Sequence, residues 1–190
     1  TNDFRGHRVN RFVISESGSG YVSRQAPDLI RTGHAAFRPI DVKIGPDGAL
    51  YIADWYNPII QHGEVDFRDP RRDHVHGRIW RVTYKGRKLS TKPRLAGQSV
   101  PVIVDQLHSE DGYTRHFAKR RLRQEDQGKV KEALGKLALR NGISSEDKLE
   151  ILWAYQSLNH LAENLLRELL GDKDHRIRAA AVRVIYHWHN

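Results

Sequence analysis

The stretch Phe37–Tyr84 reads FRPIDVKIGPDGALYIADWYNPIIQHGEVDFRDPRRDHVHGRIWRVTY, and it decides how the first half of the chain folds. Two short runs typical of β-strands, 39–45 and 49–55, flank a Pro-Asp-Gly turn, in which proline presets one φ angle and glycine supplies a positive one. A third run, 77–84, follows a long polar segment, 56–76, that is dense in histidine, aspartate and arginine. The stretch predicts three β-strands, with any chemical site in the segment between the second and third.

The residues before this stretch predict a further hairpin. Two runs that contain Val9, Phe12 and Val22, at 8–14 and 20–26, lie on either side of a Gly/Ser turn. Residues 27–36 are expected to form a loop. Residues 1–86 are therefore expected to hold an antiparallel sheet of about five strands.

Beyond Gly86 the sequence pattern changes. Residues 87–98 are polar, basic and punctuated by Gly and Pro, which is typical of a linker. Residues 99–190 place apolar residues at helical spacing. About six helices are expected, and their short connections favour stacked helical pairs, so the fold class is α+β in two parts. The helical runs are 100–107, 113–124, 129–140, 144–158, 161–170 and 174–188.

Two features indicate where these helices begin. Ser144, with Asp147 three residues later, resembles a capping box. The segments that begin at Asp111 and Asp174 echo one another, because each places an acid before a helix and Arg and Ala inside its first turns. This short repeat predicts that the helices form repeated structural units.

The composition excludes several classes of function. The 190 residues include no cysteine, which excludes disulfides, Cys-ligated zinc, thiol catalysis and covalent CxxCH haem within this chain. The formal net charge of +9 suits an anionic partner, but nucleic acid is not expected, since no helix-turn-helix, zinc-finger or aromatic RNA-binding motif accompanies the charge. No signal peptide is evident, and no apolar run approaches the ~20 residues needed to span a membrane.

Several segments resemble a known family. LLRELLGDKDHRIRAAAVRVIYHW (165–188) and SVPVIVDQLHSEDGYTRHFAKRRLR (99–123) look like HEAT-type repeats. FRPIDVKIGPDGALYIADWYNP (37–58) resembles the end of a sorbosone-dehydrogenase-like β-propeller. Together with RDPRRDHVHGRIWRVTY (68–84), these segments are similar to the membrane-bound dehydrogenase family of planctomycete-type bacteria.

The resemblance implies a larger protein, with a propeller, then HEAT repeats and often a cytochrome c domain. It implies sugar or polyol oxidation with pyrroloquinoline quinone and calcium, electron transfer to a quinone or to haem in another domain, and a periplasmic or otherwise exported location. A closed propeller needs at least about four blades of four strands. The β part is therefore expected to be the end of one blade and most of the next, in a C-terminal-side fragment. A small sheet covered by the helices is the alternative.

The segment 56–76 holds candidate catalytic and metal-binding residues. His74 and His76 would face one side of an extended backbone, where either suits a general base that accepts a hydroxyl proton. Carboxylates there favour calcium, whereas imidazoles favour zinc. The alternative is that the aspartates pair with Arg68, Arg71 and Arg72 in a lattice of ion pairs. The metal candidates are His62, Asp66, Asp69, Asp73, His74 and His76.

A second set of candidates lies at the end of the strand 49–55 and on its neighbours. Trp55 and Tyr56 suit stacking on a sugar ring or a flat quinone, and Arg38 suits an anionic group held bidentately. The alternatives are structural, with Asp54 capping the next turn and Arg38 in an internal Arg–Asp pair. The candidates for binding substrate or cofactor are Arg38, Asp41, Asp54, Trp55, Tyr56, Asn57 and Arg78.

Two functions of different classes follow. The first is part of a quinone-dependent dehydrogenase, in which this chain alone is not expected to be catalytic. The second is a protein-interaction or scaffold module, in which stacked helices bind a partner protein and their basic surface attracts an acidic partner or polysaccharide. The side chains of 56–76 discriminate between them. Convergence on an open cleft favours the first function, and pairing with arginines or backbone groups favours the second.

Overall fold

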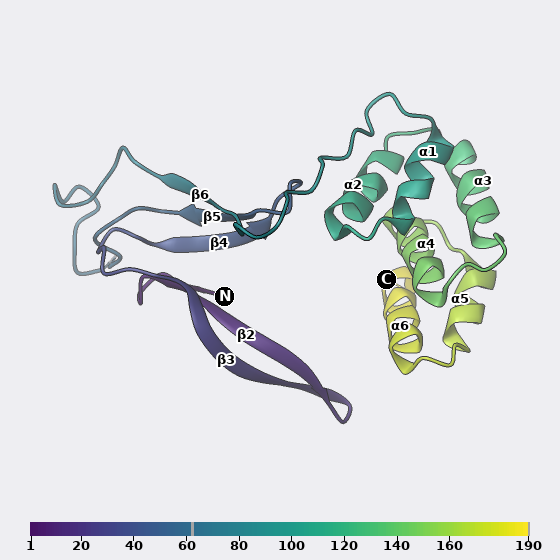
Figure 1. Cartoon of the computed structure of the whole chain (residues 1–190), viewed down its shortest axis with the longest axis horizontal. Coiled ribbons are helices and arrows are strands. Elements are labelled where there is room, and N and C mark those ends of the chain that lie inside the picture. The colour runs from purple at the N-terminus through teal and green to yellow at the C-terminus, as the bar shows by residue number, and fades with distance from the viewer. Residues whose placement is uncertain (62, 190) are drawn as a thin grey trace. The chain divides into compact units, whose positions relative to one another are not determined.

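A computed structural model of the chain divides it into two compact units, Thr1–Thr91 and Lys92–Asn190 (Figure 1). The structure describes residues 1–61 and 63–189. In this part of the chain the strands lie in the first unit, the β unit, and the α-helices in the second, the helical unit. The fold is therefore α+β, as the sequence predicts.

The β unit consists of two three-stranded antiparallel sheets, in each of which strands that follow one another in sequence pair. One sheet has the order β1-β2-β3 and the other the order β4-β5-β6, and over the described residues neither closes into a barrel. The strands are β1 (Asn2–Asp3), β2 (Arg8–Ser17), β3 (Gly20–Arg31), β4 (Pro39–Ile44), β5 (Leu50–Asp54) and β6 (Arg78–Val82).

The Pro-Asp-Gly turn forms between β4 and β5, as predicted. Gly48 has a φ of 73°, a region that glycine enters without steric cost. Asp47 in the same turn also reaches β6, because its Oδ2 accepts hydrogen bonds from Tyr51 Oη at 3.1 Å and Arg81 Nη2 at 2.6 Å. One turn residue thus connects all three strands of the sheet.

The apolar core of the β unit is small. Val9, Phe37 and Ile52 are its buried centre, with Ile30, Val42, Leu50 and Val82 packed around them. Many apolar side chains on the strands remain exposed, among them Ile14, Tyr21, Ile44 and Ile79. Because burial of apolar surface is the main stabilising term in folding, this unit depends strongly on its polar contacts.

The strand predicted at 20–26 is longer than expected. The sequence predicts a loop over 27–36, whereas β3 continues to Arg31. The pairing of β2 and β3 shifts register between Val9 and Arg11, which leaves extra residues of β3 around Pro27 in a bulge. A bulge on an edge strand tolerates proline, because no ladder bond needs the missing N–H.

The helical unit contains six α-helices and one 3₁₀ helix within the described residues. In the stack, α1 contacts α3, and α4 contacts both α2 and α6 (Figure 1). A continuous apolar core lies among them, and Ile103, Leu122, Leu134 and Leu152 are fully buried in it. The helices are α1 (Val100–Asp105), η1 (Gln106–His108), α2 (Gly112–Leu122), α3 (Gln127–Ala138), α4 (Ser145–Ser157), α5 (Glu163–Leu170) and α6 (His175–His189).

The predicted repeat has a structural counterpart at the starts of α2 and α6. The side chain of Asp111 accepts the N–H groups of residues 113 and 114, and that of Asp174 accepts the N–H of Arg176. In both helices, the arginine four residues after the acid donates hydrogen bonds to the carbonyls of the two residues that precede the acid. Arg115 Nη1 donates to the carbonyls of residues 109 and 110, and Arg178 Nη1 donates to those of residues 172 and 173. The two helices thus begin with one arrangement.

Asp111→Ala is expected to lower the free energy of unfolding of the helical unit by about 1 kcal/mol, since it removes the side-chain cap of α2. Urea denaturation followed by far-UV circular dichroism measures this loss. Asp105→Ala is the matched control, because Asp105 and its partner Arg140 are both exposed and such pairs contribute little. Equal losses for the two variants would contradict the capping role.

Across the described part of the chain, none of the helices has the length and apolar character needed to cross a membrane.

Candidate functional site

Asp54, the last residue of β5, is the centre of the candidate site in the β unit. Its side chain is 3% exposed. Oδ1 accepts hydrogen bonds from the backbone N–H of Arg38 at 2.7 Å and of Tyr56 at 2.9 Å, and Oδ2 accepts one from Trp80 Nε1 at 2.9 Å. A buried carboxylate is costly unless it is hydrogen-bonded. Asp54 meets this condition by joining groups from all three strands of the sheet or their ends.

Arg38 is buried next to Asp54 and donates to backbone carbonyls. Nε donates to the carbonyl of Asn57 at 2.9 Å, Nη1 to that of Phe4 at 2.8 Å and Nη2 to that of Pro58 at 3.0 Å. Burial lowers the pKa of the guanidinium. The predicted internal pair with Asp41 is not formed, since the exposed Asp41 contacts Lys43 at 3.2 Å instead. Arg38 therefore links its own segment to the segments that contain Phe4 and Asn57. Its guanidinium donates to carbonyl groups there and is not directed at a bound anion.

Asn57 is also committed to the backbone. Its Nδ2 donates to the carbonyl of Asp73 at 3.3 Å, and its Oδ1 accepts the N–H of Ile59 at 3.1 Å. The side chain is 4% exposed. Trp55, the neighbour of Tyr56, is half-buried, and its backbone N–H donates to the carbonyl of Arg38 at 2.9 Å.

Tyr56 is the centre of an aromatic and cationic cluster. The Arg78 guanidinium carbon lies 3.5 Å from the Tyr56 ring centroid, and the rings of His34 and His76 lie 5.7 Å and 6.3 Å away. Tyr56 has a φ of 52°, a left-handed conformation that costs energy for a bulky residue and must be held by its surroundings. Arg78 covers one face of the ring, so that face is not open for stacking on a flat ligand.

His76 and Asp73 form a close pair beside this cluster. His76 Nδ1 lies 2.9 Å from Asp73 Oδ2, and Asp73 Oδ1 also accepts the N–H groups of Val75 and His76. These two backbone bonds curl the chain, so the extended backbone expected from His74 to His76 is absent and β6 begins only at Arg78. An ionised Asp73 requires Nδ1 to carry the proton, which leaves Nε2 of a neutral His76 as a proton acceptor.

Arg72 holds the segment 56–76 in place. Although a charged residue, it is only 6% exposed. Its guanidinium donates to the carbonyls of Asp66 at 2.9 Å, Val65 at 2.8 Å and Ile59 at 3.2 Å, and also to that of Gln61. The predicted lattice of ion pairs is therefore replaced at Arg72 by bonds to backbone carbonyls.

The other two aspartates predicted as metal ligands, Asp66 and Asp69, make separate contacts. Asp69 accepts hydrogen bonds from Nε and Nη2 of Arg71 at 2.9 Å and 2.7 Å, which lowers the pKa of Asp69 to about 2. Asp66 accepts the N–H of Arg68 at 2.7 Å. Among residues 1–61 and 63–189, no three His, Asp or Glu side chains come together in a way that could hold a metal ion. The predicted ligand His62 lies outside the described residues.

Two members of the site are absent from the sequence prediction. Trp80 donates to Asp54, and His34 lies beside Tyr56. Trp80 is two residues from Arg78 on β6, and β5 pairs Ile52 with Trp80 and Asp54 with Arg78. The two-residue periodicity of a strand is the signal that could have identified Trp80, whereas nothing in the sequence near His34 marks it.

The comparisons with known proteins bear on the β unit. Residues 3–86 match a family model described as a domain of unknown function, DUF7133. No curated protein and no solved structure matches the chain. The matched range ends at Gly86, close to the boundary of the β unit at Thr91.

Asp73 is expected to titrate near pH 2. The backbone N–H groups of His76 and Val75 bind the carboxylate, which lowers its pKa from 3.8 to about 2. Because the folded-state pKa is the lower one, ionised Asp73 stabilises this turn at neutral pH, and the contribution is lost as the pH falls from 3.8 to about 2.

The amide proton shifts of Val75 and His76 measure this titration. They should move together with a midpoint near pH 2 and should lose this transition in Asp73→Asn. A midpoint at 3.8 or above would contradict the described hydrogen bonds.

Proposed function

We propose that this chain is a partner-binding module, in which the helical unit is a HEAT-like repeat that presents α2, α4 and α6 to another protein. The observation that carries the proposal is the row these helices form. Helix α4 contacts both α2 and α6, and the two outer members of the row begin with the same Asp–Arg arrangement. Rows of equivalent helices make extended surfaces for protein partners.

The proposal assigns a structural role to the predicted site in the β unit. Its most buried polar side chains, Arg38, Asp54, Asn57 and Arg72, are occupied by backbone groups. The β unit then serves as an anchor, and we propose that it is a partial propeller that joins the remaining blades of a larger protein. The small core and the exposed apolar side chains of the strands support this proposal.

Selection from a displayed library of random peptides tests the binding role. The chain contains no cysteine, so one introduced cysteine gives one site for a bulky maleimide label. Labelled His116→Cys, on α2, should abolish binding of the selected peptides. Labelled Lys129→Cys should leave this binding unchanged. Both positions are exposed, but Lys129 lies on α3, outside the row formed by α2, α4 and α6. The proposal fails if no peptide is selected or if both labels act alike.

A second candidate function is sugar or polyol oxidation within a larger protein. The Asp73–His76 pair supports it, since a carboxylate that orients a histidine prepares Nε2 to accept a hydroxyl proton. Arg78 and Tyr56 beside the pair would contact the substrate. Electrons would pass to a quinone or to haem in another domain.

The residues present do not fit calcium or pyrroloquinoline quinone as a prepared site. The carboxylates of Asp66, Asp69 and Asp73 already accept N–H bonds, and Arg38 already donates to carbonyls. The second candidate function therefore rests on the Asp73–His76 pair alone.

Reduction of an artificial electron acceptor, in the presence of a panel of sugars and polyols, tests the second candidate. Assayed together with the proposed remaining blades, His76→Gln should lower the rate by about 100-fold, the usual contribution of a general base. His74→Gln is the matched control, because His74 is exposed on the same turn. No reduction with any substrate, or equal losses in both variants, would exclude this function.

A further inference from the structure

A hollow of about 980 Å³ lies on the row formed by α2, α4 and α6. Helix α2 and the residue after it contribute His116, Lys119, Arg120 and Arg123, α4 contributes Trp153, and α6 contributes His187. None of the described residues that line the hollow carries a carboxylate. The hollow therefore combines an aromatic side chain with an excess of cationic groups.

Within the described part of the chain, no carboxylate forms an ion pair with two of the guanidinium groups in this hollow, those of Arg120 and Arg123. Lys119 is paired with an acid, because its Nζ lies 2.5 Å from Oε2 of Glu150, a carboxylate that it shares with Arg115. The same Nζ lies 5.5 Å from the centroid of the Trp153 ring. Arg120 is exposed on the surface of the hollow, and Arg123 makes one hydrogen bond, from Nε to the carbonyl of Ser157. Arginine offers five donors in a fork that matches a carboxylate, so most of this capacity remains for a ligand.

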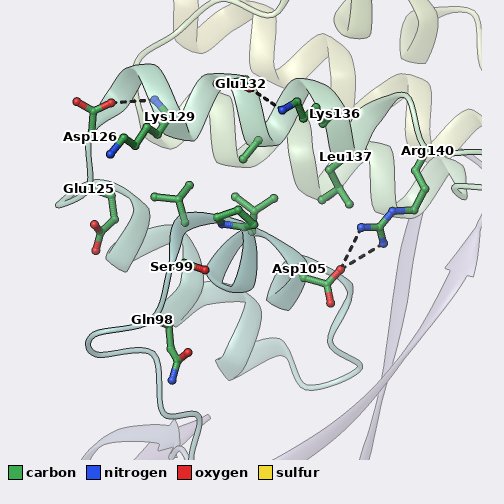
Figure 2. Close-up of a pocket in the computed structure, with 14 residues that line it drawn as sticks. Gln98, Ser99, Asp105, Glu125, Asp126, Lys129, Glu132, Lys136, Leu137 and Arg140 are labelled. Carbon is green, nitrogen blue, oxygen red and sulfur yellow. Dashed lines mark hydrogen bonds and ion pairs between the residues drawn. The ribbon is translucent and has the colours of Figure 1, made fainter.

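The hollow between α1 and α3 provides the contrast. It measures about 730 Å³ and is also lined by charged residues, but these include four carboxylates, two of which pair with basic residues of the same hollow (Figure 2). Arg140 Nη1 lies 3.2 Å from Asp105, and Lys136 Nζ lies 2.6 Å from Glu132. Figure 2 shows both pairs as dashed lines. Unbalanced positive charge is thus a property of the α2–α4–α6 hollow and not of every groove in this unit.

The cationic zone is short. A neighbouring hollow of about 400 Å³ shares Trp153 but is lined by four carboxylates, those of Glu110, Glu146, Asp147 and Glu150, against one arginine, Arg115, and one histidine, His108. A nucleic acid carries a charge on every nucleotide, and its continuation past Trp153 would meet these acids. A protein segment can place its acids on one side of Trp153 only.

We propose that the α2–α4–α6 hollow binds an acidic segment of a partner protein, with Asp or Glu carboxylates on Arg120 and Arg123 and an apolar side chain against Trp153. This inference rests on the proposed partner-binding role and adds the chemistry of the partner. Charge-assisted pairs between guanidinium and carboxylate are strong and directional, and at an exposed site they weaken as salt is added.

Fluorescence anisotropy with defined probes tests the inference on the full chain. The probes are a labelled 12-residue peptide rich in Asp, Glu and Leu, the same peptide with Asn and Gln in place of the acids, and a labelled 12-nucleotide single-stranded DNA. The acidic peptide should bind at least about tenfold more tightly than its amide counterpart and than the DNA. Its affinity should fall when the salt concentration rises from about 50 to 200 mM.

Charge reversal locates the binding. Arg120→Glu should weaken binding of the acidic peptide by about tenfold or more, since an attraction becomes a repulsion. Lys136→Glu is the matched control on α3 and should change it less than about twofold. Unchanged circular dichroism melting curves establish that both variants fold.

Equal binding of the acidic peptide and its amide counterpart, tighter binding of the DNA, or equal effects of the two reversals would overturn the inference. If library-selected peptides still lose binding to labelled His116→Cys, the partner-binding role survives and only the acidic chemistry fails. If no selected peptide depends on that label, the partner-binding role itself fails.

Discussion

Asp54→Ala is expected to lower the free energy of unfolding of the β unit by about 3 kcal/mol or more, which is enough to unfold much of it. The substitution leaves three N–H donors around a 3% exposed position without their acceptor. Each buried donor left unsatisfied costs about 1–3 kcal/mol. The core of three buried apolar residues offers little reserve against such a loss.

Hydrogen exchange of peptides from 37–58, measured over a urea series, reports this loss directly. Asp41→Ala is the matched control on the same sheet, because Asp41 is exposed and its change should stay within about 0.5 kcal/mol. Asp54→Asn should fall between the two, since its amide oxygen can still accept the two backbone N–H groups while its NH₂ faces the Trp80 donor. Equal stability of the two alanine variants would mean that Asp54 is not structural and is available to a ligand.

Arg72→Met is expected to be the second most damaging change, with a local loss of about 2 kcal/mol or more. The guanidinium donates to four backbone carbonyls of the segment 56–76, and a hydrogen bond to a charged group contributes a net stabilisation of about 1.5–3 kcal/mol. The segment should then exchange its amide hydrogens faster, because the residues of it that the structure describes form no helix or strand.

Arg71→Met provides the matched control for that variant. Arg71 is the adjacent residue and has the same chemistry, but its side chain is 70% exposed and pairs only locally with Asp69. Exposed pairs of this kind contribute about 0–1 kcal/mol. Equal acceleration of exchange in both variants would contradict the role of Arg72 as the centre of the segment.

The elements of this fold follow from local patterns in the sequence. The turn at Gly48 and the start of α4 at Ser144 are confirmed, because proline, glycine and capping residues act on their immediate neighbours. The Ser144 side chain accepts the N–H of Asp147 at 3.0 Å, which is one of the two bonds of a capping box, and its hydroxyl donates to Oδ2 of Asp147 at 2.8 Å. The helix starts at Asp111 and Asp174 follow from equally local contacts, because each acid caps N–H groups two or three residues later.

The candidate site could be predicted only in part. Arg71 and Arg72 are neighbours of one residue type, yet one is exposed and the other is buried among carbonyls. That difference depends on how 56–76 folds back on itself, which no periodic pattern describes. The departure of residues 74–76 from the predicted extended backbone has the same cause, since Asp73 accepts the N–H groups of Val75 and His76 and bends the chain there.

The proposed functions place binding on different units, and this decides the most direct test. Backbone amide chemical shifts of the ¹⁵N-labelled full chain, titrated with a peptide selected from the displayed library, map where that peptide binds. The partner-binding account predicts that shifts concentrate at Arg120, Trp153 and His187, on α2, α4 and α6. Shifts concentrated instead at Tyr56 and Arg78, or absent from the α2–α4–α6 row, would contradict it.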